Sequence, residues 1–119
     1  MFATETHRSD VCRTLLGQLR LANLWTSDGP SPECLRLAKA NGGHLSTGER
    51  IMFGAAWDLW TNGEFKIGFF ELVQSLDQER LRCIAELMLA MKCDDGGKAV
   101  SNWLSVWSLP PRPSLPPRG

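Results

Sequence analysis

STGERIMFGAAWDLWTNG, residues 46–63, carries both the start and the end signal of a helix. Ser46 and Glu49 have the S-x-x-E spacing of a capping box, in which both side chains accept hydrogen bonds from backbone N–H groups at a helix start. Asn62 and Gly63 are typical of helix ends. Between these signals apolar residues cover most of the circumference, which is typical of a buried helix. We therefore expect this stretch to form the central helix of the fold.

One narrow polar stripe interrupts this apolar helix. Arg50, Gly54 and Asp58 are successive i,i+4 positions, and Trp57 lies beside them. A glycine inside a helix costs ~1 kcal/mol relative to alanine, so its presence favours close approach by another backbone. That backbone belongs either to the same fold or to a partner. Arg50, Gly54, Trp57 and Asp58 are therefore candidate protein-interface residues, with internal packing as the alternative.

The residues before this stretch predict two further helices. The first runs from a cap at Ser9 or Asp10 to about Trp25, where the turn residues 27–30 follow. The second starts at Ser31, with a proline in its first helical position, and ends in the glycine-rich residues 41–43.

The residues after the central helix predict three more helices. Residues 64–67 alternate polar and apolar, which suits either a short extended piece or the entry to a helix. A helix of about two turns follows from Phe69. Asp77 is the expected cap of the next helix. Its expected core face is formed by Leu81, Ile84, Ala85, Leu87, Met88 and Met91, and its solvent face by Glu79, Arg82 and Glu86. The last helix covers about residues 97–107 after an Asp-Asp-Gly-Gly turn.

Two tryptophans lie one helical turn apart in this last helix. Trp103 and Trp107 share an apolar stripe with Val100 and Leu104. The stripe favours a place in the core, whereas the enrichment of tryptophan at interface hot spots favours contact with a partner. Trp103 and Trp107 are therefore a second pair of candidate interface residues.

A proline-rich tail follows the last helix. Five prolines between positions 110 and 117 exclude a helix and favour a polyproline II conformation or disorder. Pro113, Pro116 and Arg118 have the P-x-x-P-x-R spacing of a ligand for aromatic proline-recognition grooves, and a passive tail is the alternative. We predict one helical domain over residues 1–107 and a tail over 108–119.

Composition narrows the classes of function. The 119 residues include 13 basic and 13 acidic side chains, but residues 46–95 hold five basic and nine acidic ones. An acidic middle disfavours nucleic-acid contact there, because phosphate contacts need clustered Lys and Arg. No apolar run reaches the ~20 residues of a membrane span, and the polar N-terminal residues do not resemble a signal peptide. We expect a soluble, cytoplasmic protein without a membrane contact.

No residue pattern indicates catalysis, a metal or a cofactor. The four cysteines form no C-x-x-C pair, and the two histidines are not at zinc-ligand spacing from them, so we expect free structural thiols. A calcium loop starting at Asp58 would have Phe69 where a bidentate glutamate is needed. His44 beside two glycines is a candidate for acid–base work, and a solvated loop histidine is the simpler interpretation. Asp94 and Asp95 are a possible carboxylate pair, with ordinary turn chemistry as the alternative. No phosphate-binding glycine motif occurs.

The sequence thus predicts an all-α protein, a compact bundle of five or six short helices around a buried central helix. We expect a non-enzymatic protein-binding module, an adaptor, regulator or inhibitor that covers a surface of a larger protein or complex, or a homo-oligomer. The alternative is a nucleic-acid-associated regulator that uses the basic residues of the N-terminal helices, which are Arg8, Arg13, Arg20, Arg36 and Lys39.

Overall fold

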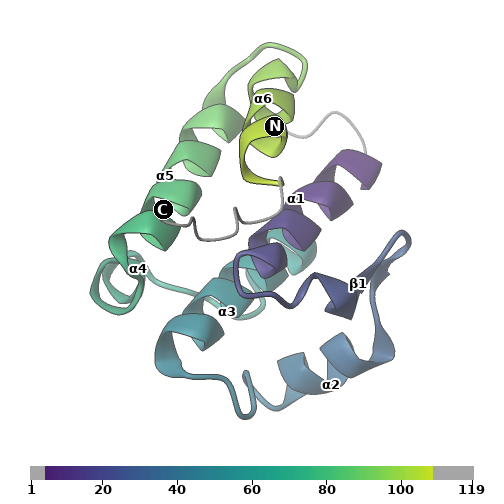
Figure 1. Cartoon of the computed structure of the whole chain (residues 1–119), viewed down its shortest axis with the longest axis vertical. Coiled ribbons are helices and arrows are strands. Elements are labelled where there is room, and N and C mark those ends of the chain that lie inside the picture. The colour runs from purple at the N-terminus through teal and green to yellow at the C-terminus, as the bar shows by residue number, and fades with distance from the viewer. Residues whose placement is uncertain (1–4, 109–119) are drawn as a thin grey trace, which may run out of the picture.

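The computed structural model describes residues 5–108, and these form an all-α fold with one small β-ribbon (Figure 1). In chain order the elements are α1 (Glu5–Gly17), the 3-10 helix η1 (Ala22–Leu24), β1 (Trp25–Thr26), β2 (Gly29–Pro30), α2 (Pro32–Lys39), α3 (Thr47–Thr61), α4 (Phe69–Ser75), α5 (Gln78–Lys92) and α6 (Lys98–Trp107). The predicted fold class is therefore confirmed. No helix among residues 5–108 is long and apolar enough to cross a membrane. The tail motif of Pro113, Pro116 and Arg118 lies outside the described residues.

Three helix starts follow the predicted capping chemistry. At α3, Ser46 Oγ accepts from the backbone N of Glu49 at 3.3 Å, and Glu49 Oε1 accepts from the backbone N of Ser46 at 3.0 Å. Ser31 caps α2 by accepting from the N–H of its third residue, and Asp77 caps α5 in the same way. Each cap satisfies a backbone donor that the helix itself leaves unpaired.

The core lies mainly between α1 and α3, which make the most extensive contact of any two elements. Fully buried apolar side chains on both helices meet there: Val11, Cys12, Leu15 and Leu16 from α1, and Ile51, Met52, Phe53 and Ala56 from α3. Figure 1 shows α5 and α6 side by side at one end of the molecule and α2 near the β-ribbon at the other. The helix predicted to be central therefore contributes one of the two main walls of the core.

The predicted first helix is wrong at both ends. It begins earlier, at Glu5, and stops at Gly17 instead of continuing to Trp25. The backbone N of Leu21 donates to the carbonyl of Leu16 at 2.9 Å, with Arg20 in the left-handed conformation at φ 62°, which is a Schellman end. Trp25 is still buried, but as a strand residue paired with Pro30. The apolar spacing continues past the end of the helix because the next segment also buries its apolar side chains, although it is not helical.

Two further expectations need correction. On α5, Ala85 and Met88 were assigned to the core face, yet both are exposed, and Met88 retains 47% of its accessible surface. The three solvent-face residues Glu79, Arg82 and Glu86 are exposed as predicted. Residues 64–67 form an irregular loop, and the extended pair lies at residues 25–30 instead. The apolar arc of α5 is wider than the surface that its neighbours cover.

Candidate functional site

The polar stripe of α3 is in contact with the loop that follows this helix. A Cβ added at Gly54 would lie 2.5 Å from Cδ2 of Phe65 and 2.7 Å from Cδ1 of Ile67. The Asp58 carboxylate accepts from the backbone N of Phe65 at 2.6 Å, of Lys66 at 3.0 Å and of Ile67 at 2.8 Å. Gly54 and Asp58 therefore serve the internal packing that was the alternative interpretation of this stripe.

The other two stripe residues also have contacts inside the fold. Trp57 is buried, and its Nε1 donates to Glu64 Oε1 at 2.6 Å. Arg50 is half-buried, with its aliphatic stem against Gly42. The structure thus brings all four residues together along one side of α3, against the chain's own loops. Contact of these residues with a partner remains a prediction.

The two candidate tryptophans of α6 differ in their surroundings. Trp103 is 4% exposed, and its Nε1 donates to the carbonyl of Cys83 on α5 at 3.0 Å. Trp107 is half-buried, and its Nε1 donates to Glu86 Oε1 at 3.0 Å. Trp103 therefore holds α6 against α5, while Trp107 presents part of its ring at the surface.

The clearest unpartnered surface lies on α4, where sequence reasoning placed no site. Phe69 is 79% exposed, Phe70 is 67% exposed and Val73 is 49% exposed, and we call these three side chains the α4 apolar surface. At about 100° per residue they share one arc of about 100°, next to the buried Leu72 and Leu76. The helix is apolar over a wider arc than the core covers. The sequence feature that could have indicated this surface is the pair of adjacent phenylalanines on a seven-residue helix.

Acidic side chains occur before, within and after α4 along the chain. Glu71 lies on α4 itself, where its Oε1 accepts from the backbone N of Gly68 at 3.0 Å. Glu64 precedes the helix, and Asp77 and Glu79 follow it; all four carboxylates are exposed. Lys66 is the one basic residue between positions 64 and 79. A partner for this surface would therefore meet an apolar patch within an acidic segment.

The described residues form no metal-binding cluster. No group of three His, Cys, Asp or Glu side chains among residues 5–108 is arranged to hold a metal ion. His44 is exposed, while Nε2 of His7 lies 3.2 Å from Ser101 Oγ, which links α1 to α6. No disulfide joins the four cysteines, of which Cys93 is exposed and the other three are buried. Burial raises the pKa of Cys34 to about 11 and that of Cys83 to about 12, which keeps both protonated and unreactive near neutral pH.

The basic residues named for nucleic-acid contact differ in burial and in location. Arg8 is half-buried, and its Nη1 donates to the carbonyl of Trp60 at 3.4 Å. Arg13, Arg20, Arg36 and Lys39 are exposed. Two of them, Arg13 and Arg20, line a pocket rather than a convex face.

No protein-family model, curated protein or solved structure matches this chain.

Proposed function

We propose that this protein is a non-enzymatic protein-binding module that contacts its partner through the α4 apolar surface. The observation that carries the proposal is the exposure of Phe69, Phe70 and Val73 on one side of a short helix. Fully burying an apolar side chain of this size stabilises a complex by about 1.5–3 kcal/mol. Phenylalanine is also enriched at the buried centre of protein interfaces. Covering this surface would therefore stabilise a complex.

The surrounding charge favours a particular kind of partner. The segment that carries the patch is acidic along the chain, with Glu64, Glu71, Asp77 and Glu79, so a partner gains from an apolar surface flanked by Lys or Arg. A symmetric dimer through the same patch would instead bring two acidic segments together, and like charges in an interface oppose association. We therefore propose a different protein as the partner rather than a second copy of this chain.

The test compares capture of partners by three forms of the protein. The bait is immobilised and exposed to nuclease-treated lysate of the cells that express it, and bound proteins are quantified by mass spectrometry. We expect a stoichiometric protein to bind the native chain and to be lost with the double variant Phe69→Ser/Phe70→Ser. The control is Leu89→Ser, because Leu89 is 71% exposed on α5 and has a similar apolar character.

Two results would contradict the proposal. One is capture of the same proteins at the same level by the native chain and by the double variant. The other is capture that occurs only in a parallel lysate left without nuclease and that falls steeply with added salt, which is the behaviour of a nucleic-acid contact. Sedimentation velocity of the purified protein distinguishes self-association from binding to another protein.

A further inference from the structure

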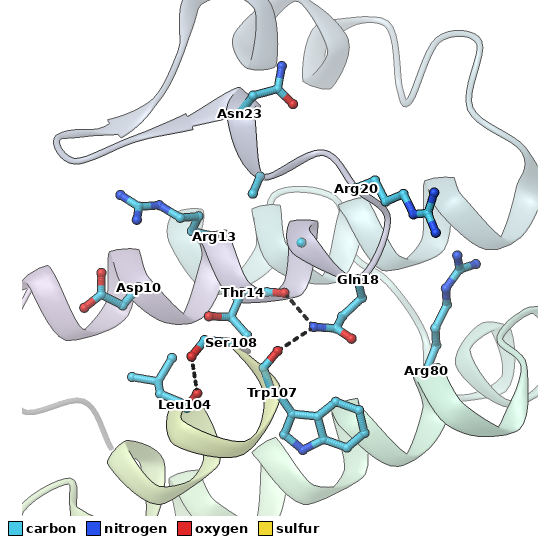
Figure 2. Close-up of a pocket in the computed structure, with 12 residues that line it drawn as sticks. Asp10, Arg13, Thr14, Gln18, Arg20, Asn23, Arg80, Leu104, Trp107 and Ser108 are labelled. Carbon is cyan, nitrogen blue, oxygen red and sulfur yellow. Dashed lines mark hydrogen bonds between the residues drawn. The ribbon is translucent and has the colours of Figure 1, made fainter. Parts of the chain in front are cut away.

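A pocket lies between α1, the segment that follows it, α5 and α6 (Figure 2). Its cavity volume is about 860 Å³, which falls in the range of about 300–1,000 Å³ that small-molecule sites occupy. Its lining residues come from four parts of the chain: Asp10, Arg13, Thr14, Gly17, Gln18, Arg20, Ala22, Asn23, Arg80, Leu104, Trp107 and Ser108. None of these residues belongs to the α4 apolar surface, so the pocket is separate from the proposed protein contact.

The pocket is rich in arginine and poor in acid. Arg13, Arg20 and Arg80 line it together with a single carboxylate, that of Asp10. Within residues 5–108, neither Arg13 nor Arg20 has a carboxylate within 4.0 Å, and Arg80 Nε lies 3.9 Å from the largely exposed Asp77. Exposed pairs of this kind contribute little to stability. The charge of Arg80 is thus partly offset by Asp77 and also by Glu49, which interacts with it electrostatically, whereas Arg13 and Arg20 have no carboxylate this close.

Two of these arginines face each other. Figure 2 shows the side chains of Arg20 and Arg80 extending toward one another from α1's end and from α5. Two guanidinium groups of like charge repel, and this repulsion becomes attraction when an anion lies between them. The planar fork of an arginine matches the oxygens of a phosphate group and binds them with paired hydrogen bonds.

The backbone at Arg20 supports a role for this side chain beyond the fold. Arg20 occupies the left-handed position of the Schellman end of α1, at φ 62°. Glycine is the usual residue there, because a side chain strains the left-handed conformation. Glycine would thus serve the fold better. What arginine adds at this position is a guanidinium at the edge of the pocket.

The remaining lining is arranged for a small molecule with an uncharged body. Gln18 Nε2 donates to the carbonyl of Thr14 at 3.1 Å and to that of Trp107 at 3.0 Å, which fixes one wall between α1 and α6 (Figure 2). Leu104 and Trp107 provide apolar surface on the α6 side. A charged end held by arginines and an apolar wall nearby are the features of small-ligand sites.

From this geometry we infer that the pocket binds a small phosphate monoester, with its phosphate between Arg20 and Arg80 and its organic body toward Trp107. The site is concave and includes Asp10, which disfavours the continuous contact that a nucleic-acid backbone makes with a basic surface.

Phenyl phosphate is a suitable probe, with inorganic phosphate for comparison. Binding is measured at constant ionic strength by isothermal titration calorimetry and by the two-dimensional NMR signals of the tryptophan indole N–H groups. We expect one site per chain, a shift of the Trp107 indole signal, and tighter binding of phenyl phosphate than of inorganic phosphate.

Three variants connect this binding to the pocket. Arg20→Gly relieves the left-handed strain, so it should raise the melting temperature while weakening phenyl phosphate binding at least tenfold. Arg80→Gln should weaken binding to a similar extent. Arg82→Gln is the matched control, because Arg82 is exposed on the same helix and does not line the pocket, and it should bind like the native chain.

The inference is overturned if phenyl phosphate shows no saturable binding, or if Arg82→Gln reduces binding as much as Arg80→Gln does. It is also overturned if Arg20→Gly is folded and binds with native affinity. A single-stranded oligonucleotide that binds far more tightly than phenyl phosphate, with a steep salt dependence, would assign the arginines to nucleic acid instead.

Discussion

The ring of Phe65 fills the space beside Gly54 that a side chain at position 54 would need. An added Cβ would lie 2.5 Å from Cδ2 of Phe65, closer than two carbon atoms can approach without displacement. Gly54 is also buried in α3, and the ring of Phe65 packs edge-on against Phe53 at a centroid distance of 5.9 Å. The glycine therefore allows the loop after α3 to return against the helix.

Substitution Gly54→Ala should therefore destabilise the protein. Overpacking of a filled site costs about 1–3 kcal/mol, and the gain in helix propensity of ~1 kcal/mol offsets part of it. We expect a lower midpoint in urea denaturation with an unchanged m-value. Gly17→Ala is the control, since its Cβ would meet only the Cβ of Ala22 at 4.0 Å. Equal stability of the two variants would contradict this account of Gly54.

Removal of the Asp58 carboxylate should loosen the same loop. Its two oxygens accept from three consecutive backbone N–H groups, and Asp58→Ala leaves all three without this partner. At about 1–3 kcal/mol for a buried donor left unsatisfied, we expect a total loss of about 3 kcal/mol, because two of the three donors are partly buried. Hydrogen exchange of the amides at 65–67 should accelerate by more than that of the α3 amides. Asp58→Asn, which keeps one acceptor oxygen, should lie between the native chain and Asp58→Ala.

The two tryptophans of α6 should differ in their contribution to stability. Trp103 is buried and bonded to α5, so Trp103→Ala should cost about 3–5 kcal/mol in the free energy of unfolding. Trp107 is half-buried, and Trp107→Ala should cost clearly less. Thermal unfolding followed by circular dichroism measures both. A larger loss for Trp107→Ala would show that α6 is held mainly by its last turn.

Substitutions on the α4 apolar surface should leave the fold intact. Phe69→Ser and Phe70→Ser each replace a side chain that is at least two-thirds exposed, so we expect changes within about 0.5 kcal/mol. Leu72→Ser on the same helix is the contrast, because Leu72 is 7% exposed and faces the core. A large destabilisation by both phenylalanine variants would mean that these rings support the fold, and lost partner binding could then reflect unfolding.

The thiols should react in the order of their exposure. Cys93 is exposed, whereas Cys12, Cys34 and Cys83 are buried. At pH 8 we expect iodoacetamide to label one thiol of the native protein and four in denaturant, counted by mass spectrometry. Labelling of Cys34 or Cys83 at the rate of Cys93 would contradict the burial of these groups.

The raised pKa values of Cys34 and Cys83 also predict a dependence of stability on pH. In the unfolded chain these thiols ionise near 9.0, while in the folded protein they stay protonated to about 11 and about 12. Their contribution is thus fully present below pH 9 and is lost as the pH rises through the folded values. The urea midpoint should therefore fall between pH 9 and pH 11, and replacing both cysteines by alanine should reduce this fall.

Some features of the fold can be predicted from short stretches of sequence because they arise from local contacts. The caps at Ser31, Ser46 and Asp77 each join a side chain to a backbone N–H three residues later. Such contacts depend on neighbours in the chain and little on the rest of the fold. The same holds for the Asn62 helix end, at φ 65°. The starts of α2, α3 and α5 and the all-α class were predicted correctly for this reason, whereas the start of α1 was not.

The end of α1 and the exposure of α4 were not predictable in the same way. Apolar spacing shows that a side chain avoids water, but it does not tell whether a helix or a strand buries it, as Trp25 demonstrates. Nor does it tell whether a neighbour exists to cover the side chain. Phe70 and Leu72 are equally apolar in the sequence, and only the packing of α4 buries one and exposes the other.

The candidate sites, too, depend partly on local sequence and partly on long-range packing. Local sequence specifies where helices start and which of their residues are apolar, because these properties arise from residues within one or two turns of each other. The facing of Arg20 and Arg80, 60 positions apart, and the open phenylalanines of α4 depend on which helices meet. Both are consequences of long-range packing, which no short stretch of the chain contains.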